Sequence, residues 1–471
     1  MPFHRIDAAA LQSLRQNVEG AVLARGDAGY DEARQIWNRR FDRRPGAIVR
    51  CADAADVKKA VDIARERNLL VAVRSGGHDY AGNSMCDDGV VIDLSGMNTV
   101  TVDAHARTVR VGPGACWADV DQAAQAQGLV TVGGTVSTVG VAGFTLGGGS
   151  GHLSRKYGLA LDNLLSADVV TAAGEVLRAS ERENSDLFWG LRGGGGNFGI
   201  VTSLELRLHE LTKDVLAGQI IYPFEAAADV LRFYRSFMDG APDDVQCYAF
   251  FLRIPPIPAF PESVHGKVVV DLVVTHAGES EAEAEQDLAP LRGFGAPILD
   301  TVALVPYATL QQAFDAGMGG GSRWYSKAHY LRDLADDAIV TILTHVAALP
   351  GEFTTAYLGG EDGAMARVDP HATAFPHRDA PFSLHIFPGW SNAADDDGMI
   401  DWARKFHGAM NRYATGGVYA NLLGGDEPDG PRSAYGANYK RLSELKAKYD
   451  PGNLFRMNHN VEPSTSSGSS A

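Results

Sequence analysis

The chain lacks any apolar segment of the length that a membrane-spanning helix requires. Crossing a bilayer takes about 20 predominantly apolar residues, and no stretch of the sequence approaches this length. The N-terminal segment MPFHRIDAAALQSLRQNVEG also lacks the apolar run of a signal peptide. These two absences predict a cytoplasmic protein that does not insert into a membrane.

Cysteine and positive charge are also scarce. The four cysteines show no CxxC spacing, so we expect reduced thiols, with neither a disulfide framework nor a metal site. Lys and Arg number 42 against 58 Asp and Glu, which gives a net charge of −16. Nucleic acid and anionic membrane surfaces would repel such a chain, so its expected partners are small molecules. The oligomeric state stays open.

The sequence has the composition of a folded protein of mixed secondary structure. At 471 residues, with 45% hydrophobic and 21% charged residues, it predicts two domains of unequal size. Helical spacing of apolar residues predicts helices at Val57, Ala60, Val61 and Ala64 behind Asp53, and at Met399, Trp402, Phe406 and Met410. β-rich segments predict strands at 90–94, 107–114 and 200–208, and a second set of strands begins near residue 215. The fold class is therefore α+β.

Glycine is concentrated in three segments, residues 76–82, 140–152 and 192–201. Such clusters favour a long ligand pressed against backbone amides, as a dinucleotide pyrophosphate would be. The GxGxxG pattern in the third segment follows a helix-like stretch and precedes a strand, which is the reverse of a Rossmann motif. No HExxH, GxSxG or P-loop pattern is present. The sequence therefore predicts a dinucleotide site of a non-Rossmann kind.

Four separated segments carry a resemblance to a known family. They are, in order, VRSGGHDYAGNS, GVAGFTLGGGSGHLSRKYGLALDNL, DLFWGLRGGGGNFGIVT and YDPGNLFRMNHNVEP. The chain resembles the berberine-bridge-enzyme-like flavoprotein oxidases, which share the vanillyl-alcohol-oxidase (PCMH) type of flavin fold. This implies an FAD-binding domain in two parts, 1–210 and 415–463, with a substrate domain at 211–414 built on an antiparallel sheet backed by helices. Residues 464–471 are expected to be a flexible tail.

The resemblance also implies how FAD is held. In this family the histidine at the position of His78 is joined covalently to the methyl group on the flavin's benzenoid ring, while the preceding glycines face the pyrophosphate. Members with a second tether have a cysteine where this chain has Val136, so a single covalent bond is expected. The other implied FAD contacts are Arg74, Ser75, Gly76, Gly77, Asp79, Gly82, Thr138, Val139, Gly140, Gly143, Gly147, Gly149, Gly151, His152, Asn163, Gly196, Asn197, Gly199, Val201, Asn458 and Asn460.

The expected reaction is hydride transfer from a small organic substrate to FAD. In the sugar- and alcohol-oxidising relatives the base is the tyrosine of a YxNY segment, and this chain keeps Tyr419 and Asn421 but has Leu422 in the last position. This departure favours an amine or alkaloid-like substrate, as in singly tethered bacterial members. A carbohydrate or alcohol oxidase with a tyrosine base and a flavin-binding protein without turnover remain alternatives.

Two further expectations concern the substrate and the electron acceptor. Residues that could line the substrate pocket are Trp324, Tyr325, His329, Tyr357, His385 and Trp390, together with Leu422. In the family a small side chain at the position of Val139 accompanies reoxidation by dioxygen, whereas leucine accompanies dehydrogenases. Val139 therefore predicts an oxidase that releases hydrogen peroxide.

Overall fold

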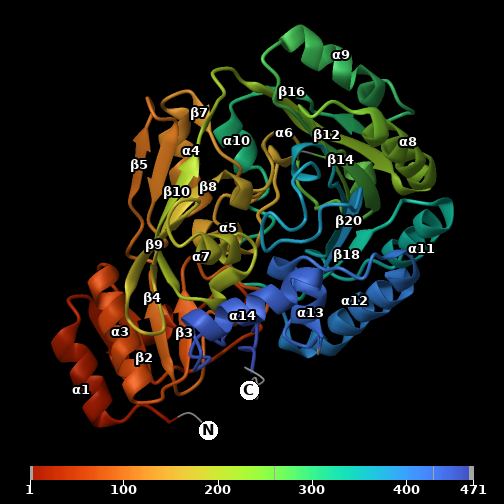
Figure 1. Cartoon of the computed structure of the whole chain (residues 1–471). Helices are drawn as coiled ribbons and strands as arrows, with labels where there is room; N and C mark the ends of the chain where they lie inside the picture. Colours follow the sequence, from red (N-terminus) through yellow and green to blue (C-terminus); the bar gives the residue numbers. More distant parts are fainter. Residues whose placement is uncertain (1–3, 259, 428, 466–471) are drawn as a thin grey trace, which may run out of the picture.

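The first half of the chain builds two sheets that lie side by side (Figure 1). The computed structural model describes residues 4–258, 260–427 and 429–465. The N-terminal sheet has the order β1-β2-β4-β3, in which β2 and β3 run parallel to β4 and β1 is antiparallel to β2. The second sheet has the order β5-β6-β10-β8-β9 and is antiparallel throughout. The strand bounds are β1 Ala21–Ala24, β2 Ala47–Arg50, β3 Val71–Arg74, β4 Val90–Asp93, β5 Val100–Asp103, β6 Thr108–Val111, β8 Leu164–Val170, β9 Val176–Ser180 and β10 Ile200–Arg207.

Helices of the first half pack on these sheets and connect them. The predicted helix behind Asp53 is confirmed as α3, and the Asp53 carboxylate caps it by accepting hydrogen bonds from the N–H groups of Ala55 and Asp56. The predicted strands at 90–94, 107–114 and 200–208 are likewise confirmed as β4, β6 and β10. The helix bounds are α1 Ala8–Asn17, α2 Tyr30–Ala33, α3 Ala54–Glu66, α4 Trp117–Gln125, α5 Val141–Gly147, α6 Ser154–Tyr157 and α7 Ser185–Leu191.

The second half is built on one large antiparallel sheet. Its strand order is β15-β12-β14-β13-β19-β20-β18, with β16 paired to β12. Two pairs of short strands, β7 with β11 and β17 with β21, lie outside it. The bounds are β7 Leu129–Val130, β11 His209–Glu210, β12 Val215–Pro223, β13 Val245–Arg253, β14 Val268–His276, β15 Leu299–Asp300, β16 Ala303–Val305, β17 Arg323–Trp324, β18 Lys327–Leu331, β19 Thr355–Gly360, β20 Phe382–Phe387 and β21 Gly389–Trp390.

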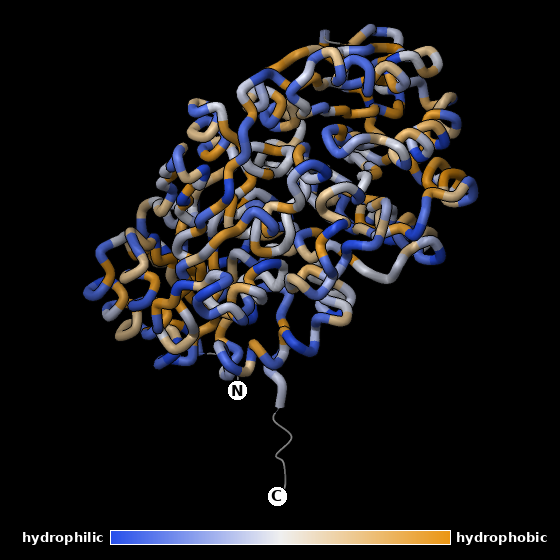
Figure 2. Tube along the Cα trace, turned by 45° about the horizontal axis from the view of Figure 1, so that its top comes forward, coloured by the Kyte–Doolittle hydropathy of each residue, from blue (hydrophilic) through white to orange (hydrophobic). Residues whose placement is uncertain are grey.

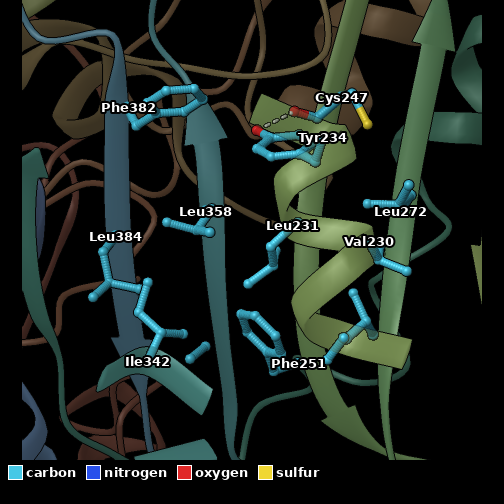
Figure 3. Close-up of a cluster of buried hydrophobic side chains, with 14 of the residues drawn as sticks. Val230, Leu231, Tyr234, Cys247, Phe251, Leu272, Ile342, Leu358, Phe382 and Leu384 are labelled. Atoms are coloured by element: carbon cyan, nitrogen blue, oxygen red, sulfur yellow. Dashed lines mark hydrogen bonds between the residues drawn. The ribbon is translucent and has the colours of Figure 1, made fainter. Parts of the chain in front are cut away.

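Helices cover one face of this large sheet and leave the other face toward residues 1–210 and 415–463, the two parts that the resemblance assigns to FAD and that we call the FAD-binding half (Figure 1). Alternate strand residues such as Phe251, Leu358 and Leu384 pack against these helices, for example on Leu231 and Ile342 (Figure 3). Apolar and polar stretches are interspersed along the whole trace (Figure 2). The helix bounds are α8 Ala227–Gly240, α9 Glu281–Arg292, α10 Tyr307–Gln311, α11 Asp336–Val346, α12 Asp396–Met410, α13 Gly430–Tyr435 and α14 Tyr439–Tyr449.

Two buried arginines join the sheet domain to the FAD-binding half. Arg155 of α6 is 2% exposed, and its Nε and Nη2 donate to the two carboxylate oxygens of Asp362 at 2.5 and 3.2 Å. Arg155 also donates to backbone carbonyls just before and within β13. Arg378 forms a second bidentate pair with Asp162, with both distances 2.8 Å. Because each of these ion pairs is bidentate, it fixes both the distance between the two halves and their relative orientation.

The C-terminal segment returns to the FAD-binding half through a buried ion pair. Lys446 of α14 and Asp450 are both fully buried, with Nζ and Oδ2 2.7 Å apart. The Lys446 ammonium also donates to the carbonyl oxygens of Asn197 and Phe455 at 2.7 and 2.8 Å. The pair therefore fastens the last residues of the chain to the third glycine segment.

The expected C-terminal tail begins with an ordered contact. The N–H of Ser464 donates to the carbonyl oxygen of Ser443 at 3.0 Å, so the chain is still attached to α14 at this residue. Residues 466–471 of the expected tail lie outside the described residues.

We predict that Lys446→Met destabilises the folded protein by about 3–5 kcal/mol, because Asp450 then remains as a buried charge without its partner. The matched control is Lys448→Met on the same helix. Lys448 pairs with Asp186 at the surface and its side chain is 58% exposed, so its loss should cost less than about 1 kcal/mol. Urea unfolding followed by tryptophan fluorescence measures both values. Equal effects of the two substitutions would contradict a stabilising role for the buried pair.

Candidate functional site

The loop after β3 approaches the segment before α5 at van der Waals contact. A Cβ on Gly76 would lie 2.6 Å from Cα of Gly140, so neither glycine can carry a side chain. The Ser75 hydroxyl donates to the carbonyl oxygen of Pro113, and Gly77 adopts a positive φ of 66°. Within the described part of the chain, the N–H groups of residues 75–78 have no acceptor. The loop thus presents a row of free backbone donors.

The His78 imidazole lies at the end of this row. Its ring stacks on Trp37 with centroids 3.9 Å apart and an interplanar angle of 20°, and Trp37 in turn stacks on Trp324 at 5.2 Å. Burial lowers the pKa of His78 to about 4, so the ring is neutral at physiological pH. Nε2 is buried and has no hydrogen-bond partner among the described residues. His78 is therefore a neutral imidazole with an unused nitrogen.

Three other segments provide groups that a dinucleotide would use. The Oδ1 atoms of Asn458 and Asn460 are buried without a donor in the described residues, and Asn458 Nδ2 donates to the carbonyl oxygen of Gly196 at 3.3 Å. A Cβ added to Gly143 or to Gly196 would meet no atom within 4 Å. Free amides, unpaired amide oxygens and open glycine surfaces are the features of a phosphate- and flavin-binding cradle, so these residues fit FAD.

Other residues of the predicted cofactor set shape the cradle through contacts within the chain. Arg74 donates to the carbonyl oxygen of Ala33, and the Asp79 carboxylate accepts from the N–H groups of Ala81 and Ser84 at 2.9 and 2.7 Å. Gly82 is required because a Cβ would lie 2.5 Å from the ring of Phe41. Thr138 and Val139 lie on the segment that contacts the His78 loop.

Two of the predicted contacts, Asn163 and Asn197, have hydrogen-bond partners within the chain. Asn163 Nδ2 donates to the carbonyl oxygens of Tyr157 and Leu159 at 3.0 and 2.9 Å. Asn197 Nδ2 donates to the carbonyl oxygen of Gly194, and its Oδ1 accepts from the N–H of Val461.

Gly151, His152, Gly199 and Val201 are also in contact with other parts of the chain. The His152 imidazole contacts Thr275 Oγ1 at 3.3 Å, Gly151 packs on the Gly133 carbonyl, Gly199 packs on Val169, and Val201 is buried in β10. His152 Nε2 is buried and has no hydrogen-bond partner among the described residues. The assignment of these four residues to FAD stays a prediction.

The glycine triplet 147–149 provides space for the C-terminal motif. A Cβ on Gly147 would lie 2.0 Å from Asn421 Oδ1, and one on Gly148 would lie 2.7 Å from the Tyr419 ring. The N–H of Gly149 donates to the Tyr419 hydroxyl oxygen at 2.7 Å, and Asn421 Nδ2 donates to the same oxygen at 2.9 Å. Gly147 and Gly149 thus help to seat Asn421 and Tyr419, and their assignment to the flavin stays a prediction.

Tyr419 closes one side of a cavity whose opposite wall is the large sheet. The residues that line it come from both halves of the chain: Thr135, Ser150, Leu159, Tyr248, Phe250, Tyr330, Tyr357, Glu361, Phe375, His385 and Tyr419. Aromatic side chains dominate the wall, and Glu361 is the acidic residue among them. Neither lysine nor arginine lines the cavity within the described residues.

Glu361 is hydrogen-bonded to a serine and a histidine on the neighbouring strand. Ser383 Oγ lies 2.5 Å from Glu361 Oε1 and 2.7 Å from His385 Nε2. Burial raises the pKa of Glu361 to about 7, although the Ser383 hydrogen bond opposes the shift. Burial also raises the pKa of Tyr419 to about 12, despite its two N–H donors. At neutral pH a large fraction of Glu361 is ionised while Tyr419 is a neutral phenol.

The structure brings only some of the predicted pocket residues together. Tyr357 and His385 line the cavity with Tyr419, but His329 faces the helix layer, where it stacks on His407 at 3.8 Å. The strand alternation places its neighbour Tyr330 in the cavity instead.

The other predicted pocket residues also point elsewhere. Trp324 stacks on Trp37, Tyr325 donates to Asp426, Trp390 donates to Asp396, and Leu422 is buried in the core of the FAD-binding half.

The sequence analysis missed Glu361, Ser383, Tyr248 and Phe250. Ser383 could have been found with His385, because residues two apart on a strand share a face. Tyr248 and Phe250 share a face for the same reason. Glu361 lies just beyond the end of β19, where alternation gives no guidance.

Three findings concern metal binding, membrane insertion and the cysteines of the described residues. They contain no cluster of three or more His, Cys, Asp or Glu side chains placed to hold a metal ion. Among the helices in residues 4–258, 260–427 and 429–465, none has the length and apolarity to cross a membrane. All four cysteines are free thiols.

Comparison with known proteins gives a consistent result. Residues 45–180 match the family described as "FAD binding domain", and residues 418–462 match the one described as "Berberine and berberine like". The chain is 33% identical to (R)-6-hydroxynicotine oxidase of Paenarthrobacter nicotinovorans over 95% of this chain and 97% of the relative. It is 30% identical to an FAD-linked oxidoreductase of Dictyostelium discoideum over 95% and 96% of the two chains.

Solved structures show the same relationship. 6-Hydroxy-D-nicotine oxidase from Arthrobacter nicotinovorans superimposes with a TM-score of 0.86 at 31% identity, covering 95% of this chain and 98% of its own. Xylooligosaccharide oxidase from Myceliophthora thermophila C1 gives a TM-score of 0.83 at 25% identity, covering 97% and 100%. The fold is that of the vanillyl-alcohol-oxidase type, and the chain belongs to the berberine-bridge-enzyme-like family of FAD-linked oxidoreductases.

Proposed function

We propose that the protein oxidises a small amine attached to an aromatic or heteroaromatic ring. The observation that carries this proposal is Glu361, a single carboxyl group in a cavity walled mostly by aromatic side chains. A protonated amine is attracted both by a carboxylate and by the faces of aromatic rings, each ring contact contributing about 0.5–2 kcal/mol. The likeness to (R)-6-hydroxynicotine oxidase supports the same substrate class.

The two candidate proton acceptors differ in their readiness to take a proton at neutral pH. Glu361, with a pKa of about 7, is about half ionised at neutral pH, and its carboxylate form can accept a proton from the substrate nitrogen. Tyr419, with a pKa of about 12, retains its own proton and acts as a hydrogen-bond donor that orients the substrate. When bound, FAD supplies the acceptor for the hydride that leaves the substrate carbon.

A carbohydrate or alcohol oxidase is the second candidate. The observation that favours it is that Tyr419 and Asn421 lie together at the cavity, and the solved relatives include chitooligosaccharide and xylooligosaccharide oxidases. A sugar would need several polar partners, whereas the cavity wall is mostly aromatic. A flavin-binding protein without turnover is the third candidate. The anaerobic flavin-reduction experiment described next distinguishes the second and third candidates from the amine oxidase.

Anaerobic mixing of the FAD-loaded protein with N-methylbenzylamine and 2-(aminomethyl)pyridine should bleach the flavin absorbance, and mixing with D-glucose, cellobiose or benzyl alcohol should not. Glu361→Gln should slow the amine-dependent bleaching by at least about 100-fold, the usual scale of a lost proton acceptor. Glu285→Gln on the outer helix α9 is the matched control and should change nothing. Faster bleaching by a sugar would favour the carbohydrate oxidase, and no bleaching by any compound would favour the protein without turnover.

We also propose that His78 carries FAD covalently through a single bond. The neutral ring with an unpartnered Nε2, next to the row of free backbone N–H groups, supports this attachment. The protein should stay yellow after acid precipitation, and a tryptic peptide containing His78 should carry the mass of FAD. His78→Ala should still bind FAD through the rest of the cradle but release all of it on denaturation. Release of all flavin from the unaltered protein would refute the tether.

Dioxygen is the proposed electron acceptor, with hydrogen peroxide as product, and Val139 is the residue that admits it. The backbone of Val139 is fixed by hydrogen bonds to Trp117 and Val136, so a substitution there changes mainly the side-chain volume. Val139→Leu should slow reoxidation of the reduced enzyme by at least about tenfold, equal to about 1.4 kcal/mol, and leave anaerobic reduction nearly unchanged. Stopped-flow mixing with dioxygen measures this, and equal reoxidation rates would remove the gating role.

A further inference from the structure

The Trp37 indole lies between the His78 imidazole and a tryptophan of residues 211–414, which we call the large-sheet half. Its ring stacks on His78 with centroids 3.9 Å apart at an interplanar angle of 20°, and on Trp324 with centroids 5.2 Å apart at 13°. Trp37 is half-buried, whereas Trp324 is 1% exposed. The three rings therefore form a continuous stack from the loop after β3 to the short strand β17.

Two hydrogen bonds fix the Trp37 side chain and backbone in this stack. The indole Nε1 donates to the carbonyl oxygen of Met318 in the large-sheet half at 2.7 Å. The backbone N–H of Trp37 donates to the carbonyl oxygen of Gly77 at 3.1 Å, which ties it to the residue before His78. The indole is thus held in its own plane by Met318 and against tilting by the rings on its two faces.

The residues after Trp37 are joined to the large-sheet half by four more hydrogen bonds. The Asn38 side chain, which is fully buried, donates from Nδ2 to the carbonyl oxygen of Trp324 at 2.9 Å and accepts from its N–H at 3.0 Å. The N–H of Arg39 donates to the carbonyl oxygen of Ser322 at 3.0 Å, and Arg323 Nη1 donates to the carbonyl oxygen of Arg39 at 3.1 Å. The position of the indole therefore depends on how the two halves are docked.

The stack supplies the orientation that hydrogen bonds do not supply to His78. The second side-chain torsion of histidine has a broad distribution, so contacts must set the plane of the ring. A reactive histidine is often oriented by a carboxylate bonded to one of its nitrogens. Here the Asp79 carboxylate accepts from the N–H groups of Ala81 and Ser84 instead. No side chain among residues 4–258, 260–427 and 429–465 hydrogen-bonds to the His78 imidazole.

We infer that Trp37 is a positioning residue for the covalent attachment of FAD, because its indole fixes the plane of the His78 imidazole. This inference rests on the proposed attachment at His78. The attachment replaces one C–H bond of the flavin methyl group and the N–H bond of the imidazole by a C–N bond. The two hydrogens and two electrons pass by way of the flavin to dioxygen, the proposed acceptor, and leave as hydrogen peroxide. Trp37 itself gains and loses no atom.

Attachment should depend on this orientation much more strongly than FAD binding does. Bond formation requires the reacting atoms at about 3–3.5 Å with aligned orbitals, and a misplacement of about 1 Å can cost about 100-fold in rate. Binding without a covalent bond uses the free N–H groups of residues 75–78 and the unpaired amide oxygens of Asn458 and Asn460. Removal of the Trp37 ring should therefore separate attachment from binding.

Trp37→Leu and Trp37→Met both remove the flat ring from the imidazole, and either variant that folds decides the question. The purified proteins are kept in air with excess FAD, and samples taken over time are analysed by acid precipitation and peptide mass. Total flavin per chain should stay near that of the unaltered protein, while covalent attachment should be at least about 100-fold slower. Attachment at the unaltered rate, or loss of FAD binding altogether, would overturn the positioning role.

Trp37→Phe separates the stacked ring from the hydrogen bond to Met318. A phenyl ring can still cover the imidazole, so attachment should proceed at a rate between those of the unaltered protein and Trp37→Leu. Trp402→Leu is the matched control, because Trp402 is also half-buried and its Nε1 donates to the carbonyl oxygen of His345 at 3.3 Å. It should leave attachment unchanged. If Trp37→Phe were as slow as Trp37→Leu, the flat ring would not be the orienting feature.

The stack itself is measured by NMR of the FAD-loaded protein with ¹³C-labelled histidine, in which the His78→Ala spectrum identifies the His78 signal. The ring current of the stacked indole should shift the carbon-bound protons of His78 upfield, and this contribution should disappear in Trp37→Leu. Identical His78 shifts in the two proteins would overturn the inference. Release of all flavin from the unaltered protein would instead refute the proposed attachment, whereas full and rapid attachment in Trp37→Leu would refute the inference alone.

Discussion

The pairing of Arg155 with Asp362 is the interaction on which the site depends. The guanidinium group belongs to the FAD-binding half, is 2% exposed and binds both carboxylate oxygens of Asp362. Asp362 is adjacent to Glu361, so the same bonds that join the two halves also fix the cavity carboxyl group. A buried charge without its partner is strongly unfavourable, which means that the halves cannot separate at this point without a large cost. The position of the cavity therefore depends on how the two halves are joined.

Glycine has two different roles around this cavity. At Gly76 and Gly140 it allows two backbone segments to touch, and at Gly147 it leaves room for Asn421. At Gly143 and Gly196 the added Cβ would meet nothing within 4 Å, so packing within the chain does not require a glycine there. Glycines within the same segments are therefore subject to different constraints.

Burial raises the pKa of both polar groups at the cavity, with different consequences. The pKa of Tyr419 rises to about 12, so this side chain stays a neutral phenol at neutral pH, whereas that of Glu361 rises to about 7. A proton acceptor works best when its pKa lies near the working pH. Under the proposed function, Glu361 therefore takes the place of the tyrosine that the YxNY motif has at the position of Leu422.

The sequence by itself determined the elements whose signals are local. The apolar spacing behind Asp53 and the alternation in β4, β6 and β10 specify helix and strand because the backbone periods are 3.6 and 2 residues. The four family segments likewise indicated FAD and the position of His78, while the domain boundaries remain a prediction. Only the tertiary structure decided the cavity wall. Alternation shows that His329 and Tyr330 point to opposite faces but cannot say which face the other half covers. The contact of Glu361, which follows β19, with Ser383 on β20 depends on the register of these two paired strands, which no local pattern contains.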